Sequence, residues 1–485
     1  MSPLEIPTVD WLPLLPLLIV TAGALAVLVA DLFMEGPEHD SLAWVSVGAL
    51  AIAALASALL WGTRGHTLSA TVVLDNYALF FDLLFCMATM LTVLMSVDYL
   101  PTTAVRGGEY YALALFATVG MMAMAAANDL IVVFLGLEVM SIAVYVLAGI
   151  WRQDLRSNEA ALKYFLLGAF ATGFLLFGIA LVYGVAGTTR LDLIASRLGS
   201  VGEEGGDLFL LGVGLLVIGF GFKVAAVPFH VWTPDVYEGA PTSVTALMAV
   251  GVKAAAFAAF ARVFLATFGA VAEEWNGLLW WIAAATMTVG NLLAISQSNI
   301  KRMLAYSSIA HAGYALVAIV AGTQEAGAAL LFYLLAYAAM NLGAFAVVIA
   351  LGRAGEPNEE IERYAGLGLR RPLLALAMGA FMLSLAGVPP LVGFAGKFYL
   401  FGAAVEAGYV GLAVVGVLNS VVSAYYYIWV IVQMYMFEGA VEPAPLSERP
   451  YLATTIGLSF AATLFCGVFP GLFFALARSG FLSLG

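Results

Sequence analysis

The chain has 485 residues, of which 63% are hydrophobic and only 10% are charged. A soluble domain carries about a quarter charged residues, so this composition excludes an ordinary soluble protein and indicates a membrane protein. The net charge of −12 and the lack of any Lys/Arg-rich run argue against a nucleic-acid binder. The two cysteines, Cys86 and Cys466, are too few and too far apart to build a disulfide framework, a zinc site or an iron–sulfur site.

Stretches of about 20 mostly apolar residues are long enough to cross a bilayer as helices. Fourteen such stretches follow one another along the chain, at 11–33, 41–62, 76–98, 109–127, 129–150, 158–186, 207–232, 241–269, 275–296, 301–322, 325–352, 373–403, 408–437 and 451–477. They predict an all-α polytopic membrane protein with about 14 transmembrane helices. The first stretch is preceded by Glu5 and Asp10 rather than by basic residues, so we expect a retained anchor and not a cleaved signal peptide.

The arginines and lysines of the loops predict the orientation, because cytoplasmic loops carry an excess of these residues. Ten of them follow odd-numbered spans, namely Arg106, Arg152, Arg156, Lys301, Arg302, Arg353, Arg363, Arg370, Arg371 and Arg449. Only four lie on the other side, namely Arg64, Arg190, Arg197 and Arg478. Both termini are therefore predicted to lie on the periplasmic side.

Four of the five lysines fall inside predicted spans, whereas thirteen of the fourteen arginines lie in loops or at span ends. The intramembrane lysines are Lys163, Lys223, Lys253 and Lys397, and the intramembrane arginine is Arg262. A charge at mid-helix costs roughly 2.5–3.5 kcal/mol on insertion scales, and a desolvated lysine, unlike arginine, can lose its proton near neutral pH. The pattern favours proton transfer. Static ion pairs or snorkelling to the interface are the alternative, and for Lys163, near the start of its span, both interpretations stay open.

Glu138 lies at the centre of the fifth span and is the only acid that we place so deep. It requires a cationic partner, and Lys223, near mid-depth two spans later, is the natural choice. At a separation of about 7 Å and an effective dielectric constant of about 20, the two charges would be coupled by roughly 2.4 kcal/mol. A change in this separation would switch Lys223 between holding and releasing a proton. The alternative is a static structural pair.

The seventh and twelfth spans both combine glycine, proline and lysine. The seventh contains Gly219-Phe220-Gly221-Phe222-Lys223 followed by Pro228, and the twelfth contains Pro389-Pro390 followed by Gly393-Phe394-Ala395-Gly396-Lys397. Proline removes a helix hydrogen bond, so both helices should be interrupted, which a membrane protein tolerates only in a polar or wet interior. Because the two spans are an odd number of helices apart, they run in opposite directions, as in an inverted repeat.

We therefore expect two inverted five-helix repeats, made of spans 4–8 and spans 9–13. The corresponding boundaries are 1–108 for an N-terminal three-helix segment, 109–270 and 271–438 for the two repeats, and 439–485 for a C-terminal helix. The proline follows the lysine in one broken span and precedes it in the other, so the repeats are not identical. His230 and His311 could relay protons between sites because imidazole titrates near neutral pH, or they could be hydrogen-bonded structural residues.

Two longer strings carry a family resemblance. The segment from Gly221 to Pro241 reads GFKVAAVPFHVWTPDVYEGAP, and the segment from Ser298 to Tyr314 reads SNIKRMLAYSSIAHAGY. Both resemble the proton-conducting membrane transporter family shared by complex I (NADH-quinone oxidoreductase) and multisubunit cation/proton antiporters, and the resemblance covers nearly the whole chain. Within that family, the DVYEGAP string and the lysine at 397 are similar to subunit N, the homologue of mitochondrial subunit 2.

This resemblance implies a non-redox subunit of a proton-translocating NADH-quinone oxidoreductase, which couples quinone reduction to proton transport. Glu138 is similar to the family's fifth-helix glutamate, Lys223 to its seventh-helix lysine, Lys253 to its central eighth-helix lysine and Lys397 to its twelfth-helix residue. The resemblance implies no cofactor in this chain; FMN, iron–sulfur clusters and quinone are expected in partner subunits. The expected partners are an antiporter-like neighbour and the small quinone-end subunits, in the plasma (inner) membrane of a bacterium.

Two other functions stay open at this point. A subunit of a multisubunit sodium/proton antiporter would use similar lysines but would need neither NADH nor quinone. A stand-alone solute carrier with broken helices would bind a substrate in a central cavity and would transport it as a single chain.

Overall fold

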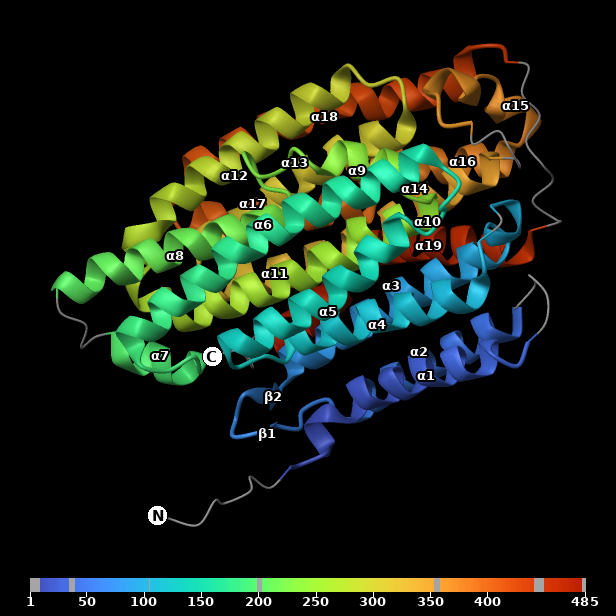
Figure 1. Ribbon diagram of the computed structural model, residues 1–485. Coiled ribbons are helices and arrows are strands. Elements are labelled where there is room, and N and C mark those ends of the chain that lie inside the picture. Colours follow the sequence, from blue (N-terminus) through green and yellow to red (C-terminus); the bar gives the residue numbers. More distant parts are fainter. Residues whose placement is uncertain are drawn as a thin grey trace.

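The computed structural model describes residues 9–34, 40–103, 105–198, 203–352, 358–439 and 449–481. Long helices run side by side through these ranges, and only a small two-stranded sheet interrupts them (Figure 1). Glu5 and Arg353, which contributed to the anchor and orientation predictions, lie outside the described residues.

The elements of the first half are α1 (Leu15–Asp31), α2 (Asp40–Leu59), β1 (Gly65–Thr67), β2 (Val72–Leu74), α3 (Asn76–Val97), α4 (Gly107–Ala125), α5 (Leu130–Ala148), α6 (Leu155–Ala186), α7 (Leu191–Arg197), α8 (Glu203–Val224), α9 (Thr233–Gly239), α10 (Thr242–Leu247) and α11 (Lys253–Ala261). The π-helical segment Met248–Val252 joins α10 to α11, and a second one, Arg262–Thr267, extends α11, so that Thr242–Thr267 forms one continuous span. The strands β1 and β2 pair antiparallel, with His66 opposite Val73.

The elements of the second half are α12 (Ala272–Ile295), α13 (Ile300–Ala321), α14 (Gln324–Leu351), α15 (Leu367–Arg370), α16 (Pro372–Ala386), α17 (Val392–Glu406), α18 (Val410–Met436), α19 (Pro450–Val468) and α20 (Pro470–Phe481). Short 3₁₀ turns lie at Leu12–Leu14, Leu100–Thr102, Gly269–Val271 and Ile361–Tyr364.

Within the described residues, 13 helices are long and apolar enough to cross a membrane, and α16 is a shorter apolar helix. This confirms the all-α polytopic membrane fold. The predicted twelfth span, 373–403, consists of two short helices, α16 and α17, which Gly387–Leu391 separates. The count of 13 spans plus this broken one agrees with the predicted 14.

Two predicted span ends were wrong. The seventh span was expected to reach residue 232, but α8 ends at Val224, and the chain reaches α9 through a non-helical segment that contains Pro228. The last span was expected to run through 451–477, but it divides into α19 and α20 after Val468, because Pro470 cannot continue the hydrogen bonding of the preceding helix.

The continuous span Thr242–Thr267 is the innermost one, since its whole apolar length is buried, and α13 and α14 are almost as deeply enclosed. By contrast, only about a third of the residues in the apolar stretches of α1, α6, α18 and α19 are buried, as expected of helices on the outside of the chain. The sheltered interior therefore lies where the two halves of the chain meet.

Glycine permits the closest helix contacts. A Cβ atom on Gly120 would lie 2.6 Å from the carbonyl oxygen of Gly136, so α4 and α5 approach backbone to backbone. A Cβ atom on Gly290 would lie 2.6 Å from the backbone nitrogen of Ala310, which gives α12 and α13 the same close approach. Membrane helices pack in this way through small residues because lipid supplies no hydrophobic force to hold them together.

Candidate functional site

Lys253 lies near the middle of the innermost span. The residue is only 4% exposed. Its Nζ donates to the carbonyl oxygen of Ser308 at 2.7 Å and to the hydroxyl of Ser308 at 2.5 Å. The ring centroid of Tyr237 lies 5.9 Å from the same nitrogen, which favours a cation over the ring face. The π-helical segment Met248–Val252 ends directly before Lys253, and such segments are frequent at functional sites.

Lys223 lies at the C-terminal end of α8 and is 1% exposed. Its Nζ donates to the hydroxyls of Ser141 at 2.7 Å and Tyr145 at 3.2 Å, both on α5. Glu138 lies one turn before Ser141 on the same helix and interacts electrostatically with Lys223. Oε1 of Glu138 is buried and accepts no hydrogen bond from the described residues, so the contact between this acid and Lys223 is through space.

Lys397, on α17, binds the end of the helix that precedes it. Its Nζ donates to the carbonyl oxygens of Leu385 at 3.1 Å and Ala386 at 3.0 Å, the last residues of α16. Gly387 ends that helix with φ +93°, a left-handed conformation that favours glycine. The amine therefore lies at the negative end of the α16 dipole, and the ring centroid of Tyr314 lies 4.8 Å away.

His311 interacts electrostatically with both Lys397 and Lys253. It is 3% exposed, and each ring nitrogen faces a phenol: Nδ1 lies 2.6 Å from the hydroxyl of Tyr333, and Nε2 lies 3.1 Å from the hydroxyl of Tyr427. One nitrogen can donate while the other accepts, so a change of tautomer would reverse both hydrogen bonds.

Lys163 and His230 lie away from these buried contacts. Nζ of Lys163 pairs with Glu159 at 2.6 Å and with Asp235 at 2.7 Å, and its side chain is 40% exposed. Asp235 also accepts from Arg302 at 2.8 Å, so Lys163 belongs to a surface ion-pair group on α6, α9 and α13. His230 lies, partly exposed, in the segment between α8 and α9, and its described contacts do not include a lysine.

Two charged residues are more deeply enclosed than the sequence indicated. Lys301 was assigned to a loop, but it is 2% exposed, and its Nζ donates to the carbonyl oxygens of Glu238 at 2.7 Å and Ala240 at 2.8 Å. Asp82, in α3, is 7% exposed, whereas Glu138 is only half-buried in this chain, so Glu138 is not the only acid inside a span. The position of Asp82 inside a predicted span could have indicated its burial. No residue near Lys301 in the sequence indicates that this lysine is buried.

Arg262 is held in a static ion pair. Its guanidinium donates to both carboxylate oxygens of Asp75, at 2.9 and 3.0 Å, and to the carbonyl oxygen of Ala125 at 3.0 Å. This bidentate pair ties the innermost span to the start of α3 and the end of α4. The intramembrane arginine is therefore paired with a carboxylate, whereas Lys253 and Lys397 donate to hydroxyl and backbone carbonyl oxygens.

In the described part of the chain, no three His, Cys, Asp or Glu side chains lie close enough together to hold a metal ion. The groups that contact the three buried amines are hydroxyls, backbone carbonyls and aromatic rings, and His311 interacts electrostatically with two of these amines.

Comparisons with known proteins show the family of this chain. The family model described as NADH:quinone oxidoreductase/Mrp antiporter, TM, matches residues 127–423. NADH-quinone oxidoreductase subunit N of Trichlorobacter lovleyi is 51% identical over 471 residues, which cover 97% of this chain and 97% of that protein. A chain in the structure of respiratory complex I from Thermus thermophilus with bound aureothin has a TM-score of 0.81 and 37% identity, covering 96% of this chain and 99% of that chain.

A chain of the Mrp complex from a Dietzia species shares the fold, with a TM-score of 0.81 over 98% of this chain and 97% of that chain, but is only 21% identical. The similarity to subunit N thus extends over nearly the full length and is much stronger in sequence. The chain belongs to the NADH:quinone oxidoreductase/Mrp antiporter transmembrane family, and its relatives of high identity are subunits N of NADH-quinone oxidoreductase.

Proposed function

We propose that this chain is a proton-translocating membrane-arm subunit of NADH-quinone oxidoreductase. The observation that carries the proposal is the environment of Lys253, a buried amine whose hydrogen-bond acceptors are a hydroxyl and a backbone carbonyl rather than a carboxylate. A buried amine locked to a carboxylate would stay charged, whereas one with neutral acceptors can exist with or without its proton. The redox reaction to which we couple this proton exchange is inferred from the high identity of the chain to subunits N of NADH-quinone oxidoreductase.

In the proposed mechanism, quinone reduction elsewhere in the complex changes the distance between Glu138 and Lys223. The weaker attraction releases the proton of Lys223, which reaches Lys253 and then Lys397. Each ring nitrogen of His311 faces a phenol, and the residue interacts electrostatically with Lys253 and Lys397. It supports this order because it can accept a proton on one nitrogen while it donates from the other. Lys397 then discharges the proton to the periplasmic side.

We further propose that residues 109–270 and 271–438 are two inverted repeats. Two features recur at the expected offset of five spans and support this division. The pairs α4–α5 and α12–α13 both approach through glycine, at Gly120 and Gly290. The broken regions after α8 and α16 both place a lysine amine, Lys223 or Lys397, beside the break.

We also propose how the chain is oriented in the membrane and which subunits surround it. The Arg-rich ends of the spans face the cytoplasm of a bacterium, and both termini face the periplasm. The chain contacts an antiporter-like neighbour and the small quinone-end subunits, while FMN, iron–sulfur clusters and quinone reside in partner subunits. The chain itself performs no redox step.

A subunit of a sodium/proton antiporter remains the second candidate, because an Mrp-complex chain shares this fold. The weak identity of 21% to that chain, against 51% to a subunit N, favours the redox-coupled function. Copurification of this chain with NADH-oxidising activity would support the redox-coupled subunit and argue against the sodium/proton antiporter subunit. A stand-alone solute carrier would instead transport its substrate as a purified single chain.

The experiment that tests the proposed function is the Lys253→Met variant in the assembled complex. We expect proton pumping to fall sharply, because methionine fills the space of lysine without carrying a proton. The quinone reduction that is coupled to pumping should fall with it. Lys163→Met is the matched control: its amine is exposed and ion-paired, and its loss should leave pumping close to wild type. Full pumping by a correctly assembled Lys253→Met complex would contradict the central role of this amine.

A further inference from the structure

The amine of Lys223 is surrounded by aromatic rings. Its Nζ lies 5.3 Å from the ring centroid of Tyr145, 5.7 Å from that of Tyr164 and 5.7 Å from that of Phe222. A cation within about 6 Å of a ring face is attracted by the electron density of that face. The described contacts of the other two buried amines include one such ring each. We call the rings of Tyr145, Tyr164 and Phe222 the aromatic cage.

Tyr164, on α6, reaches the amine with its ring and not with its hydroxyl. The residue is 0% exposed, and its hydroxyl makes no hydrogen bond to the described residues. The hydroxyl of Tyr145, by contrast, accepts from Nζ of Lys223 at 3.2 Å. The contribution of Tyr164 to this site is therefore the face of its ring.

Trp232 holds the ring of Tyr164 in place. The two rings are stacked, with centroids 4.4 Å apart and planes 10° apart. Nε1 of Trp232 donates to the carbonyl oxygen of Phe222 at 3.1 Å, which is one of the last four carbonyls of α8. Such carbonyls lack the usual partner one turn further along the helix, so they are free to accept from elsewhere. The helix end directly after Lys223 thus helps to orient the aromatic cage.

Gly168 makes room for the third ring of the aromatic cage. It lies one turn after Tyr164 on α6, and a Cβ atom there would collide with the hydroxyl of Tyr145. The rings of Tyr145 and Tyr164 meet edge to face, with centroids 4.7 Å apart and planes 87° apart. One face of α6 therefore supplies a ring for the amine of Lys223 and a gap for the hydroxyl that binds it.

The aromatic cage differs from Glu138 in its effect on the proton. Glu138 attracts the charged amine of Lys223 electrostatically, and a carboxylate can also accept a proton. A ring face attracts an ammonium group but does not accept its proton. The aromatic cage therefore stabilises the charged amine without competing for the proton, and its attraction persists if Glu138 moves away.

We propose that Tyr164 is a positioning residue for proton transfer, and that it holds the ammonium group of Lys223 against its ring face together with Phe222. The proposal rests on the proposed function and adds what keeps this amine charged between two transfers. A weaker ring face would lower the fraction of Lys223 that carries a proton, so pumping should fall with it.

The test changes the electron density of the ring and leaves its shape nearly unchanged. Position 164 receives phenylalanine, and then phenylalanine with one, two or three fluorine atoms, in the assembled complex in membrane vesicles. Fluorine withdraws electron density from the ring face and weakens the attraction for a cation. With Tyr164→Phe as the reference of the series, we expect the rate of proton pumping to fall with each added fluorine, and by more than half with three.

Two natural phenylalanines complete the experiment. Phe222 belongs to the aromatic cage, and its fluorinated forms, with the wild-type chain as reference, replace the first series if Tyr164→Phe does not assemble. Phe220 is the matched control, because it is also buried on α8 but its ring contacts are Phe260 and Phe264. Fluorinated Phe220 should pump at the wild-type rate.

The proposal is overturned if three fluorine atoms leave pumping at the rate of the reference. It is also overturned if they reduce pumping equally at Phe220, because the size of fluorine would then be the cause. If Lys253→Met stops pumping while the fluorinated cage complexes pump like their reference, the proposal for Tyr164 fails alone. If Lys253→Met pumps normally, the proposed function itself fails, whatever the rings do.

Discussion

At the scale of single residues, the buried lysines differ from the buried arginine in what they bind. Lys253 and Lys397 donate to backbone carbonyls and a hydroxyl, whereas Arg262 forms a bidentate pair with Asp75. An arginine keeps its proton under all ordinary conditions, so a fixed carboxylate partner suits it. The lysines lack such a partner among the described residues, and this leaves their protonation free to change with the surrounding charges.

The sequence indicated that Lys223, Lys253 and Lys397 are buried, because each lies inside an apolar run, but it did not indicate what they bind. Ser308 lies more than fifty residues from Lys253, and only the packing of α13 against the innermost span brings them together. The expected partner of Lys223, Glu138, lies nearby, but the direct hydrogen bonds come from Ser141 and Tyr145. Lys301 was assigned to a loop because the α9 carbonyls that cover it are distant in the sequence.

Gly387 provides a prediction at this scale. Its φ of +93° costs an alanine about 1–2 kcal/mol, and a Cβ atom there would lie 3.1 Å from Cδ of Lys397. Gly387→Ala should therefore displace Lys397 from the end of α16 and reduce pumping by the assembled complex. Gly379→Ala, in the same helix with no atom within 4 Å of the added methyl, is the control. Equal pumping by both variants would show that the position of the amine does not matter.

At the scale of helices, the positions of glycine and proline and the lengths of the apolar stretches predicted the membrane helices correctly. The predicted ends of two of these helices were wrong. The prolines correctly predicted interruptions near 228 and at 389–390. They did not predict that α8 would stop at Val224, directly after Lys223, because the helix end depends on the packing of the following segment. The two π-helical segments of the innermost span also have no sequence signal, since their residues favour an ordinary α-helix.

The close contact between α4 and α5 leads to a second prediction. A Cβ atom on Gly120 would collide with the backbone of α5, 2.6 Å from the carbonyl oxygen of Gly136. Gly120→Ala should destabilise the pair by about 1–3 kcal/mol and lower the thermal midpoint of the purified complex. Gly173→Ala, on α6 with open space around the added methyl, should change the midpoint little. If both variants melt alike, the backbone approach is less tight than described.

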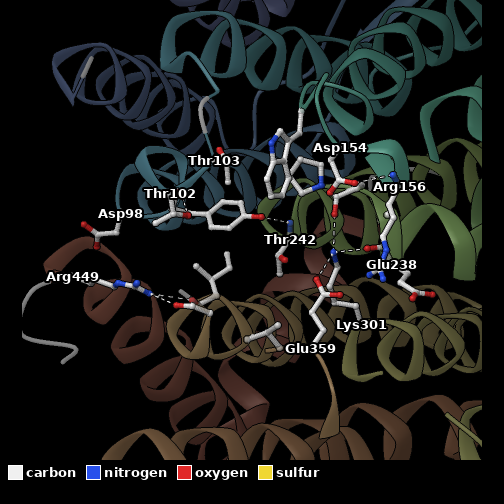
Figure 2. Close-up of a pocket in the computed structure, with 18 residues that line it drawn as sticks. Asp98, Thr102, Thr103, Asp154, Arg156, Glu238, Thr242, Lys301, Glu359 and Arg449 are labelled. Carbon is white, nitrogen blue, oxygen red and sulfur yellow. Dashed lines mark hydrogen bonds and ion pairs between the residues drawn. The ribbon is translucent and has the colours of Figure 1, made fainter. Parts of the chain in front are cut away.

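At the scale of the whole molecule, most ion pairs of the described residues lie near helix ends, whereas the interior amines of Lys253 and Lys397 have no carboxylate partner in that part of the chain. The ion-pair group around Asp235 ties α6, α9 and α13 together at the Arg-rich end. A polar cavity of about 420 Å³ lies beside this group, lined by segments from seven separate parts of the chain (Figure 2). No pattern along the sequence could predict that convergence, because it depends on how distant helix ends meet.

Asp235 gives a prediction about acid. Burial alone would raise the pKa of this carboxyl, but hydrogen bonds from Lys163 and Arg302, with their positive charges, hold the pKa below its ordinary value of 3.8. A lowered pKa stabilises the folded state above the ordinary pKa, and that stability is lost as the pH falls through the lowered value. Since these pairs are partly exposed, each contributes at most about 1 kcal/mol.

Asp235→Asn should therefore lower the thermal midpoint of the complex slightly, by the same amount from about pH 8 down to about pH 5. The difference from wild type should shrink only at lower pH, where the wild-type carboxylate also loses its charge. A difference that already disappears between about pH 7 and pH 6 would contradict the lowered pKa.

The central claim, that Lys253 works by losing and regaining a proton, is tested most directly by Lys253→Arg. Arginine keeps a positive charge at this position but cannot release its proton. In a fully assembled complex, with NADH oxidation and proton pumping measured in the same vesicles, we predict that Lys253→Arg pumps as poorly as Lys253→Met. If Lys253→Arg pumps at the wild-type rate, a fixed charge is all that this position supplies, and the account is wrong.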